Sequence, residues 1–463
     1  VGSAGRRCTL NFETRNPATG ELIEQFDFLT DDQLDQRLYS AEQAAEAWRF
    51  SSFAERSKLM HALGVLITER RQQLAETISL EMGKLLTEAL GEVDKCALAC
   101  GYYADNAEAM LQDDLIETPA QRSLVAYEPL GVILAIMPWN FPLWQVFRCL
   151  VPAMMAGNGI VLKHAPNVPR CAKLVETLLR DAGAPEGLVS ELTISVDQAA
   201  KVIADHRING VAFTGSEGAG RKIGAMAGQH LKKAVLELGG SDPLIVLDDA
   251  DLEAALDVAM RARFSNAGQI CIASKRFLVV PSRITEFTEL LVERTKALKT
   301  GDPLNPETTL APMARADLRD QVHQQVQATI AEGARALTGC HILEGEGYYY
   351  APSVLDNVKL GMTAFNEEIF GPVASIVAVR NEADAVAQAN ATRFGLGASV
   401  WTQDVEKGEA ILRQLDVGAG FVNAQVASDI RMPFGGTKAS GLGRELGVNG
   451  IREFCNSKSV WIA

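Results

Sequence analysis

The sequence predicts an α/β protein built from two doubly wound domains in tandem. Short apolar strands alternate with amphipathic helices up to residue 238, and a second series of the same kind begins at Pro243. Strands and helices that alternate in this way are typical of parallel sheets covered on both faces. The chain has 463 residues, which is too long for one hydrophobic core and indicates two or three domains. Two α/β units in tandem place a ligand site in the cleft between them, at strand ends.

The segment before this alternation is predicted to be mostly helical after a short extended start. Thr30 and Gln33 match the pattern of a capping box, which would begin an amphipathic helix that runs to about Arg49. Residues 54–90 contain no proline and keep apolar residues at helical spacing, which predicts more helix.

The alternation of the first unit can be followed element by element. Residues 122–128 have the pattern of a half-exposed strand, and the continuous apolar run 132–137 predicts a fully buried one. A helix is expected over 142–156 and a strand over 160–163. Further alternation leads to a strand over 234–238.

The second unit repeats this pattern. It is predicted to contain strands over 244–247 and 276–280 and helices over 251–264 and 284–298, with further alternation to about Val422. The tail at 459–462 is predicted to be a strand that completes a sheet elsewhere in the chain or in a partner subunit.

Composition and charge argue against several classes of protein. The chain has 58 acidic and 44 basic residues, a formal net charge of −14 and no long basic block, so we expect no nucleic-acid binding. The most apolar stretch, 132–147, is interrupted by Pro138, Asn140 and Pro142 and is too short to cross a bilayer, so we expect no membrane partner. The first residues lack the apolar core of a signal peptide, and we expect a cytoplasmic protein.

The eight cysteines are too sparse for a disulfide scaffold. They form no CxxC pair, and Cys96 and Cys100 have no histidine or further cysteine nearby at zinc spacing. We therefore expect no metal site, and mostly buried thiols in a reducing compartment.

Three segments carry residues that could take part in binding or catalysis. For each of them a purely structural role is the alternative. The glycine-rich turn 213–220 follows a predicted strand and opens a helix, as a phosphate site requires, but any tight turn favours glycine. Glu237 lies among apolar residues before two glycines. Burial would poise it as a base, whereas a turn carboxylate facing solvent would be inert. Cys271 lies in a glycine-containing loop whose N–H groups would stabilise a thiolate or an oxyanion, and otherwise it is an inert thiol.

Six segments taken together resemble the aldehyde dehydrogenase superfamily. In order along the chain they are PWNFP (138–142), FTGS (213–216), LELGG (236–240), GQIC (268–271), EEIFGP (367–372) and PFGGTKASG (433–441). The resemblance extends from Asn16 to the final strand. Within the superfamily the chain is most similar to bacterial succinate-semialdehyde dehydrogenases, on the strings KHAPN (163–167) and LGGSDP (238–243) and on Ser428 shortly before PFGG.

The resemblance implies an aldehyde dehydrogenase-like fold of two doubly wound α/β domains with an interleaved strand extension for oligomerisation. The dinucleotide-binding domain would comprise residues 1–110 and 130–239, and the catalytic domain with the nucleophile residues 240–435. Residues 111–129 and 436–463 would form the oligomerisation segments. Such strands pair across subunits in this superfamily, which implies a homodimer or homotetramer.

The resemblance also implies the reaction, which is NAD(P)-dependent oxidation of an aldehyde to a carboxylic acid. Cys271 matches the nucleophile that forms a thiohemiacetal and then a thioester. Asn140 matches the side-chain donor that stabilises the oxyanion together with the Cys271 N–H. Glu237 matches the base that activates water for hydrolysis of the thioester.

The expected cofactor is NAD or NADP. Its proposed contacts, carried over position by position, are Trp139, Lys163, Gly215, Ser216, Glu368 and Phe370. Pro166 stands where many NAD-preferring relatives carry a glutamate that binds the ribose hydroxyls. Without that carboxylate a 2′-phosphate is not repelled, and Lys163 would be able to pair with it, so we expect use of both cofactors.

On the substrate side, Arg148 matches a carboxylate-binding arginine of semialdehyde-using relatives, and Ser428 matches a loop serine that helps to hold the same group. A second arginine of some relatives is replaced by Ser265. The expected reaction is therefore the oxidation of succinate semialdehyde to succinate.

Other functions remain open at this point. The first alternative is a dehydrogenase for another short aliphatic aldehyde, with Arg148 structural. A CoA-acylating enzyme is disfavoured by Glu237, since such enzymes tend to lack the hydrolytic base. A catalytically silent binding protein on the same fold is disfavoured by the presence of all three catalytic residues. A thiol hydrolase or acyltransferase would show no nicotinamide reduction with any aldehyde.

Overall fold

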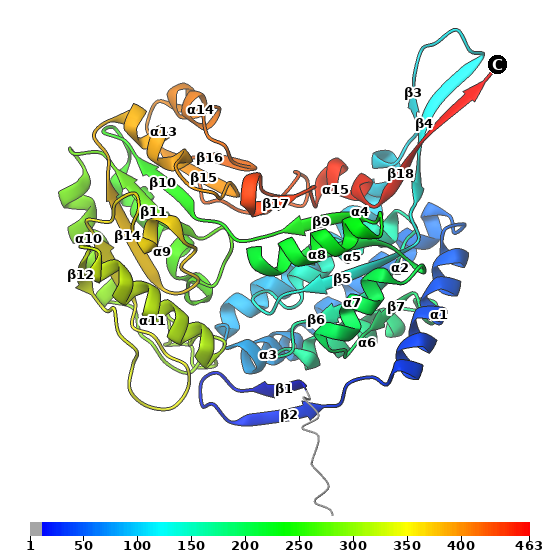
Figure 1. Cartoon of the computed structure of the whole chain (residues 1–463), viewed down its shortest axis with the longest axis horizontal. Coiled ribbons are helices and arrows are strands. Elements are labelled where there is room, and N and C mark those ends of the chain that lie inside the picture. Colours follow the sequence, from blue (N-terminus) through cyan, green and yellow to red (C-terminus); the bar gives the residue numbers. More distant parts are fainter. Residues whose placement is uncertain (1–11) are drawn as a thin grey trace, which may run out of the picture.

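The computed structural model describes residues 12–463, which form two α/β lobes and a projecting arm (Figure 1). The α/β fold predicted from the alternation of strands and helices is confirmed. Among the described residues, no helix combines the length and the apolar character needed to cross a membrane.

The first lobe is built on a six-stranded sheet with the order β17-β9-β8-β5-β6-β7. All neighbouring strands are parallel except β17, which runs antiparallel to β9. The strands are β5 (Val132–Met137), β6 (Gly159–His164), β7 (Val189–Glu191), β8 (Ile208–Thr214), β9 (Lys233–Glu237) and β17 (Gly441–Leu442). A separate hairpin precedes them, formed by β1 (Phe12–Arg15) and β2 (Leu22–Phe26).

Helices cover both faces of this sheet, which explains the continuous apolar run of β5. Val132 and Leu134 pack in one core with residues of α1 (Asp31–Trp48) and α7 (Val196–Ala204), near α8 (Glu217–Gln229). Ile133 and Ala135 point into the opposite core. The helices on that side are α2 (Phe53–Glu69), α3 (Arg71–Met82), α4 (Leu86–Met110), α5 (Trp144–Met155), α6 (Pro169–Asp181) and α15 (Gly447–Glu453).

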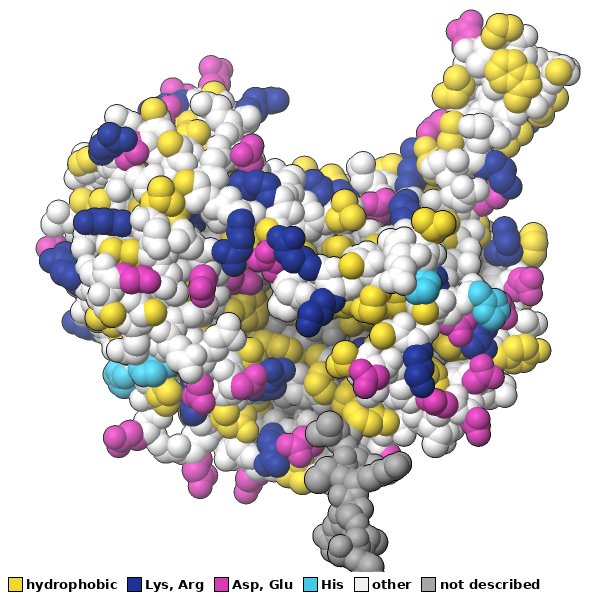
Figure 2. Space-filling view, viewed as in Figure 1, with side chains coloured by type: hydrophobic (Ala, Val, Ile, Leu, Met, Phe, Trp, Pro, Cys, Tyr) yellow, Lys and Arg dark blue, Asp and Glu magenta, His cyan; other side chains and the backbone are white. Residues whose placement is uncertain are grey.

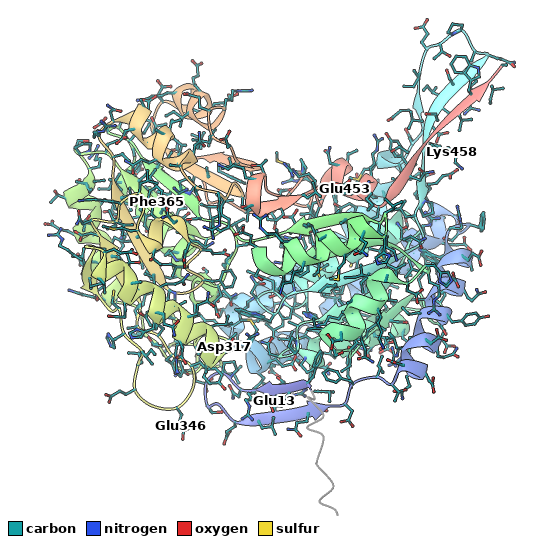
Figure 3. All side chains as sticks on the ribbon, viewed as in Figure 1. Glu13, Asp317, Glu346, Phe365, Glu453 and Lys458 are labelled. Carbon is teal, nitrogen blue, oxygen red and sulfur yellow. The ribbon has the colours of Figure 1, made fainter. Side chains whose placement is uncertain are left out.

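The second lobe contains a seven-stranded sheet with the order β12-β13-β14-β11-β10-β15-β16, parallel except for β12. Its strands are β10 (Asp242–Val246), β11 (Ser274–Val279), β12 (Arg335–Thr338), β13 (Ser353–Asp356), β14 (Val373–Ala378), β15 (Gly397–Trp401) and β16 (Ala419–Val422). Its helices are α9 (Leu252–Phe264), α10 (Ile284–Lys296), α11 (Ala316–Ala331), α12 (Thr363–Asn366), α13 (Glu382–Asn390) and α14 (Val405–Leu412). Phe365, labelled in Figure 3, is fully buried in the core of this lobe.

The arm is an antiparallel sheet of three strands with the order β18-β4-β3. Strand β18 (Cys455–Ile462) pairs along its whole length with β4 (Arg122–Pro129), and β3 (Asp114–Leu115) pairs with the other edge of β4. Lys458 lies on the arm and Glu453 at its base (Figure 3), and Lys458 forms an ion pair of 2.5 Å with Glu128. The predicted tail strand is therefore paired within the same chain.

Two sequence expectations differ from the structure. The helical stretch 54–90 is divided into α2, α3 and the start of α4, because Gly83 takes a left-handed conformation (φ 81°) that ends α3. The expected oligomerisation segment 436–463 is also divided. Strand β17 completes the first sheet and α15 packs on α4 and α5, so only β18 belongs to the arm.

One buried ion pair joins α4 to the loop that follows β5. Lys84, which precedes α4, pairs with Glu92, and both side chains are at most 1% exposed. The other oxygen of Glu92 accepts hydrogen bonds of 2.9 Å from the N–H groups of Leu143 and Trp144, which begin α5. The Lys84 ammonium also lies 3.6 Å from the centre of the Phe141 ring. This pair thereby fixes the segment 138–142 against α4.

We predict that Lys84→Met lowers the free energy of unfolding by roughly 3–5 kcal/mol, because it leaves the Glu92 carboxylate buried without a cation. The matched control is Lys58→Met on the exposed face of α2, where the change should stay within about 0.5 kcal/mol. Urea titration followed by circular dichroism measures both values. Equal effects of the two substitutions would contradict a structural role for the pair.

Candidate active site

The loop that carries Cys271 lies between α9 and β11 and has an unusual backbone. Asn266, Ala267 and Gly268 all have positive φ, of 52°, 51° and 73°. Such a conformation costs of order 1–3 kcal/mol for each residue other than glycine, so it persists only where the surroundings hold it. Cys271 follows this turn and is only partly buried.

Buried side chains from several elements hold this loop in place. Glu88 of α4 accepts from the N–H of Asn266 at 3.0 and 3.1 Å. Arg263 donates to the carbonyl of Gly268 at 2.8 Å. Lys275 donates to the carbonyls of Ile270 and Cys271 at 3.0 and 2.7 Å. The position of the thiol is therefore determined by both lobes.

Asn140 is buried directly against the same loop. Its Nδ2 donates to the carbonyl of Gln269 at 3.0 Å, and its own carbonyl accepts from Nδ2 of Asn266 at 3.0 Å. The segment 138–142 that carries Asn140 is the one fixed by Glu92. The structure thus brings Asn140 and Cys271 together, as their proposed roles require.

Glu237 ends β9 and is almost fully buried, with 3% of its surface exposed. Neither carboxylate oxygen has a hydrogen-bond partner in the structure. Burial raises the pKa of Glu237 well above its usual value, and the Glu445 carboxylate raises it further, while Arg148 and Arg444 oppose the rise. A carboxyl group with free oxygens and a raised pKa is fitted to accept a proton from water.

The pKa of the Cys271 thiol is raised to about 11, mainly by burial, although Arg148 and Lys275 act to lower it. At neutral pH the thiol is therefore protonated in the protein alone. A further positive charge or a base nearby is needed to form the thiolate.

Two cavities meet at Cys271. The first has a volume of about 200 Å³ and is lined by Trp139, Asn140, Gly215, Ser216, Glu237, Glu368 and Phe370, among others. The second, of about 330 Å³, is lined on its other sides by residues of α4 and α5, by Arg148 and by Ser428. Gln145 lines both cavities beside Cys271. The thiol can thus react with a molecule in either cavity.

The first cavity has features that fit a dinucleotide. Ser216 is the N-cap of α8, so the positive end of that helix lies at the cavity wall, where a phosphate is stabilised. A side chain at Gly239 would collide with the Glu368 carboxylate, which itself is ion-paired with Lys275 at 3.1 Å. The rings of Trp139 and Phe370 meet edge to face, 5.8 Å apart.

Lys163 and Pro166 do not line this cavity. Lys163 is the penultimate residue of the buried strand β6, and its ammonium donates to the carbonyl of His164 at 3.0 Å and lies 5.3 Å from the ring centre of Phe12. Burial lowers the pKa of Lys163 to about 8. Lys163 forms no ion pair among the described residues, although the charge of Glu191 opposes the lowering of its pKa.

Arg148 lines the second cavity but is already paired. Its guanidinium forms an ion pair with Glu445, donates to Oγ1 of Thr214 at 3.3 Å and lies 4.6 Å from the ring centre of Phe434. Both members of the pair are buried, with 2% and 4% of their side-chain surface exposed. Most of the charge of Arg148 is therefore compensated within the protein.

Sequence reasoning missed several residues of this site. Lys275, Glu88, Glu92, Glu445 and Lys95 were not singled out. Glu88, Glu92 and Lys95 are spaced by four and three residues in an otherwise apolar part of α4, which is a helical pattern that would have placed charges on a buried face. The partner of Arg148 lies 297 residues away at Glu445 and has no local signal.

Comparison with known proteins agrees with this geometry. A model of the Aldehyde dehydrogenase family matches residues 6–460. The chain belongs to the aldehyde dehydrogenase family. Both the family and the fold expected from the six motifs are confirmed.

Two sequence relatives in the family are similar over nearly their whole length. The NAD(P)+ succinate semialdehyde dehydrogenase Sad of Escherichia coli strain K12 is 46% identical over 446 residues, which are 96% of each chain. An NADP(+) succinate-semialdehyde dehydrogenase of Mycobacterium bovis BCG is 44% identical over 97% of this chain and 99% of its own.

A solved structure has a similar fold over nearly the whole chain. Succinic semialdehyde dehydrogenase from Streptococcus pyogenes, in complex with NADP+ as the cofactor, superposes with a TM-score of 0.96 at 39% identity. The match covers 97% of this chain and 99% of that one.

Proposed function

We propose that this aldehyde dehydrogenase oxidises succinate semialdehyde to succinate with NAD or NADP. The observation that carries the proposal is the position of Cys271 where two cavities meet, one fitted to a dinucleotide and one lined with cationic side chains. The relatives and the neighbouring structure named above support both the substrate and the cofactors.

After its proton has passed to water, the Cys271 thiolate attacks the aldehyde carbon in this mechanism. The sulfur forms a bond to that carbon, and the carbonyl oxygen becomes the oxyanion of a thiohemiacetal. Asn140 lies against the loop of Cys271 and has a second N–H besides the one that donates to Gln269. That N–H and the backbone N–H of Cys271 stabilise the oxyanion. When bound, the nicotinamide cofactor supplies the hydride acceptor that turns the thiohemiacetal into a thioester.

Glu237 activates water for the second half of the reaction. Its carboxylate accepts a proton from water, whose oxygen attacks the thioester carbon and releases the acid and the Cys271 thiolate. The two unpartnered oxygens of Glu237 support this role. Because the pKa of Glu237 is raised, hydrolysis should become faster as the pH rises and more of the residue is ionised.

We propose that the first lobe binds the cofactor and the second lobe supplies the nucleophile. The cofactor contacts would be Trp139, Lys163, Gly215, Ser216, Glu368 and Phe370, with Pro166 beside the adenosine ribose. The N-cap of α8 would face the pyrophosphate. Lys163 would reach the ribose or a 2′-phosphate, and the absence of a carboxylate at Pro166 is compatible with either cofactor.

Arg148 and Ser428 are the proposed contacts of the distal carboxylate, and both line the second cavity. The Arg148–Glu445 ion pair favours the alternative function, in which the substrate is another short aliphatic aldehyde and Arg148 is structural. Comparison of succinate semialdehyde with butanal separates these readings, because the two aldehydes differ in the carboxylate and share the chain length.

We also infer that the enzyme is a homodimer or homotetramer in the cytoplasm. The arm projects from the body, and hydrophobic side chains gather at its tip (Figure 2), including Leu115 and Trp461, which are 72% and 61% exposed. Strand β18 also has an unpaired edge. The cysteines of the described part of the chain are all free, which supports a reducing compartment.

The substrate proposal predicts a preference of the wild-type enzyme. The kcat/KM for succinate semialdehyde should exceed that for butanal by at least about tenfold, which corresponds to one charge-assisted hydrogen bond. Absorbance of the reduced nicotinamide, with NAD+ and with NADP+, measures both constants. Arg148→Ala should lower the kcat/KM for both aldehydes, because Glu445 loses its cation beside Glu237; an additional loss of about tenfold for the semialdehyde would identify Arg148 as a contact of the distal carboxylate. Equal constants in the wild type would refute succinate semialdehyde as the substrate.

The two half-reactions can be separated at Glu237. Glu237→Gln should form the thioester but lower the steady-state rate by about a hundredfold or more, since only hydrolysis needs the base. Mass spectrometry of the intact protein should show the acyl group on the variant. The double variant with Cys271→Ala is the control and should carry no acyl group. Normal turnover by Glu237→Gln would mean that water is activated elsewhere.

The oligomer has a direct physical test. Light scattering at micromolar concentration should give the mass of two or four chains of 49.9 kDa. Trp461→Asp places a charge on the apolar tip of the arm and should shift the mass towards the single chain. A monomer mass for the wild-type protein would contradict the role proposed for the arm.

A further inference from the structure

Lys95 of α4 lines the second cavity, which is also lined by Cys271. It follows Glu88 and Glu92 on the same face of the helix, by seven and three residues. Its ammonium donates a hydrogen bond of 2.7 Å to Oγ of Ser428 and lies 4.2 Å from the ring centre of Trp144. Lys95 thus meets α5 and the loop after β16 at one point of the cavity wall.

The other cations of this wall are compensated. Lys84 is paired with Glu92, and Arg148 is paired with Glu445. Glu88 accepts hydrogen bonds from the N–H of Asn266, and desolvation raises its pKa while the Lys84 charge opposes the rise. Within residues 12–463, Lys95 forms no ion pair, and the nearby carboxylates of Asp94 and Asp429 are paired with Arg71 and Arg431. Lys84 and Arg148 thus each have an ion-pair partner, whereas Lys95 has none among the described residues.

We propose that Lys95 binds the distal carboxylate of the substrate, with Ser428 as a second donor, and that it determines the preference for an aldehyde that carries an anion. This inference rests on the proposed function and names the group that carries its specificity. The carboxylate would supply the counter-ion that the protein does not, and the ion pair would form beside the indole ring of Trp144.

The environment of Lys95 supports this role. Burial lowers the pKa of Lys95 to about 8, and the positive charge of Arg148 on α5 lowers it as well. Cys96 and Glu92 on its own helix and Asp429 in the neighbouring loop act in the opposite direction. A partly desolvated ammonium without a counter-ion gains more from an incoming carboxylate than a compensated one. Below pH 8 it is charged and binds the anion.

The first test compares Lys95→Met with the wild type on two substrates. The kcat/KM for succinate semialdehyde should fall about ten- to a hundredfold, as expected for the loss of a hydrogen bond between charged groups. The kcat/KM for butanal should change less than about threefold. Lys95→Arg should recover most of the ratio between the two substrates, since it keeps the charge. Lys58→Met, the same replacement on the exposed face of α2, should leave both constants unchanged.

The second test measures how the ratio of the two kcat/KM values changes with pH in the wild type and in Lys95→Arg. Cys271 and Glu237 act on both aldehydes, so the effects of their ionisation cancel in the ratio of the two kcat/KM values. The pH dependence of this ratio therefore reports other ionisable groups of the free enzyme. In the wild type this ratio should be high below pH 8 and fall above it as Lys95 loses its proton. In Lys95→Arg the ratio should stay flat to pH 10, because the guanidinium does not titrate there.

The outcomes distinguish this inference from the proposed function. A wild type without preference for the semialdehyde refutes the substrate itself. If the wild type prefers the semialdehyde, two results would refute the role of Lys95 alone: an unchanged ratio in Lys95→Met, or a wild-type ratio that does not change with pH. Arg148 would then be the residue that binds the carboxylate. A ratio that collapses in Lys95→Met and returns in Lys95→Arg supports the proposal.

Discussion

The position of Asn140 relative to Cys271 depends on the interactions of the Glu92 carboxylate. One of its oxygens holds the first two N–H groups of α5, and the other is paired with Lys84. A buried carboxylate that accepts two backbone hydrogen bonds and faces a cation has most of its desolvation cost offset. One turn earlier on the same helix, Glu88 holds the nucleophile loop at Asn266. A single helix of the first lobe therefore sets the distance between Asn140 and Cys271, which belong to different lobes.

This arrangement explains how a strained loop is maintained at the centre of the site. The left-handed turn at Asn266 and Ala267 is unfavourable in isolation. It is held by a carboxylate from one lobe and by Arg263 and Lys275 from the other, so that it cannot relax without breaking bonds to both. Lys275, one of these side chains, also opposes the rise that burial causes in the pKa of the Cys271 thiol. The positive charge of Arg148 opposes the rise in the pKa of this thiol and of Glu237.

Local patterns in the sequence predicted local structure well. The run Val132–Met137 has the expected bounds of β5, and the capping box of Thr30 and Gln33 is present at the start of α1, because both depend on neighbouring residues alone. The break at Gly83 was missed, since one glycine without proline is a weak signal within an apolar repeat.

Long-range contacts were the part that local patterns could not supply. Cys271, Asn140 and Glu237, which the resemblance assigned to one site, line the same cavity in the structure, and their catalytic roles stay predictions. The pairing of Arg148 with Glu445 and the exposure of Lys95 to the same cavity depend on the packing of α4, α5 and the segment after β17. Charges on a helix face do not by themselves reveal which partners the fold will bring to them.

The late position of β17 has a consequence for the synthesis of the protein. This strand forms the edge of a sheet whose other members lie between residues 132 and 237, and Glu445 follows it by three residues. Almost the whole chain must therefore be synthesised before the first sheet can be completed and before Arg148 can pair with Glu445. A chain cut short near residue 435 would have the nucleophile, the base and the oxyanion donor, yet it would expose an unfinished sheet edge and a buried cation without its acid. An exposed sheet edge favours aggregation and recognition by chaperones and proteases, so the residues after 435 are needed for a stable first lobe although they supply none of the three catalytic residues.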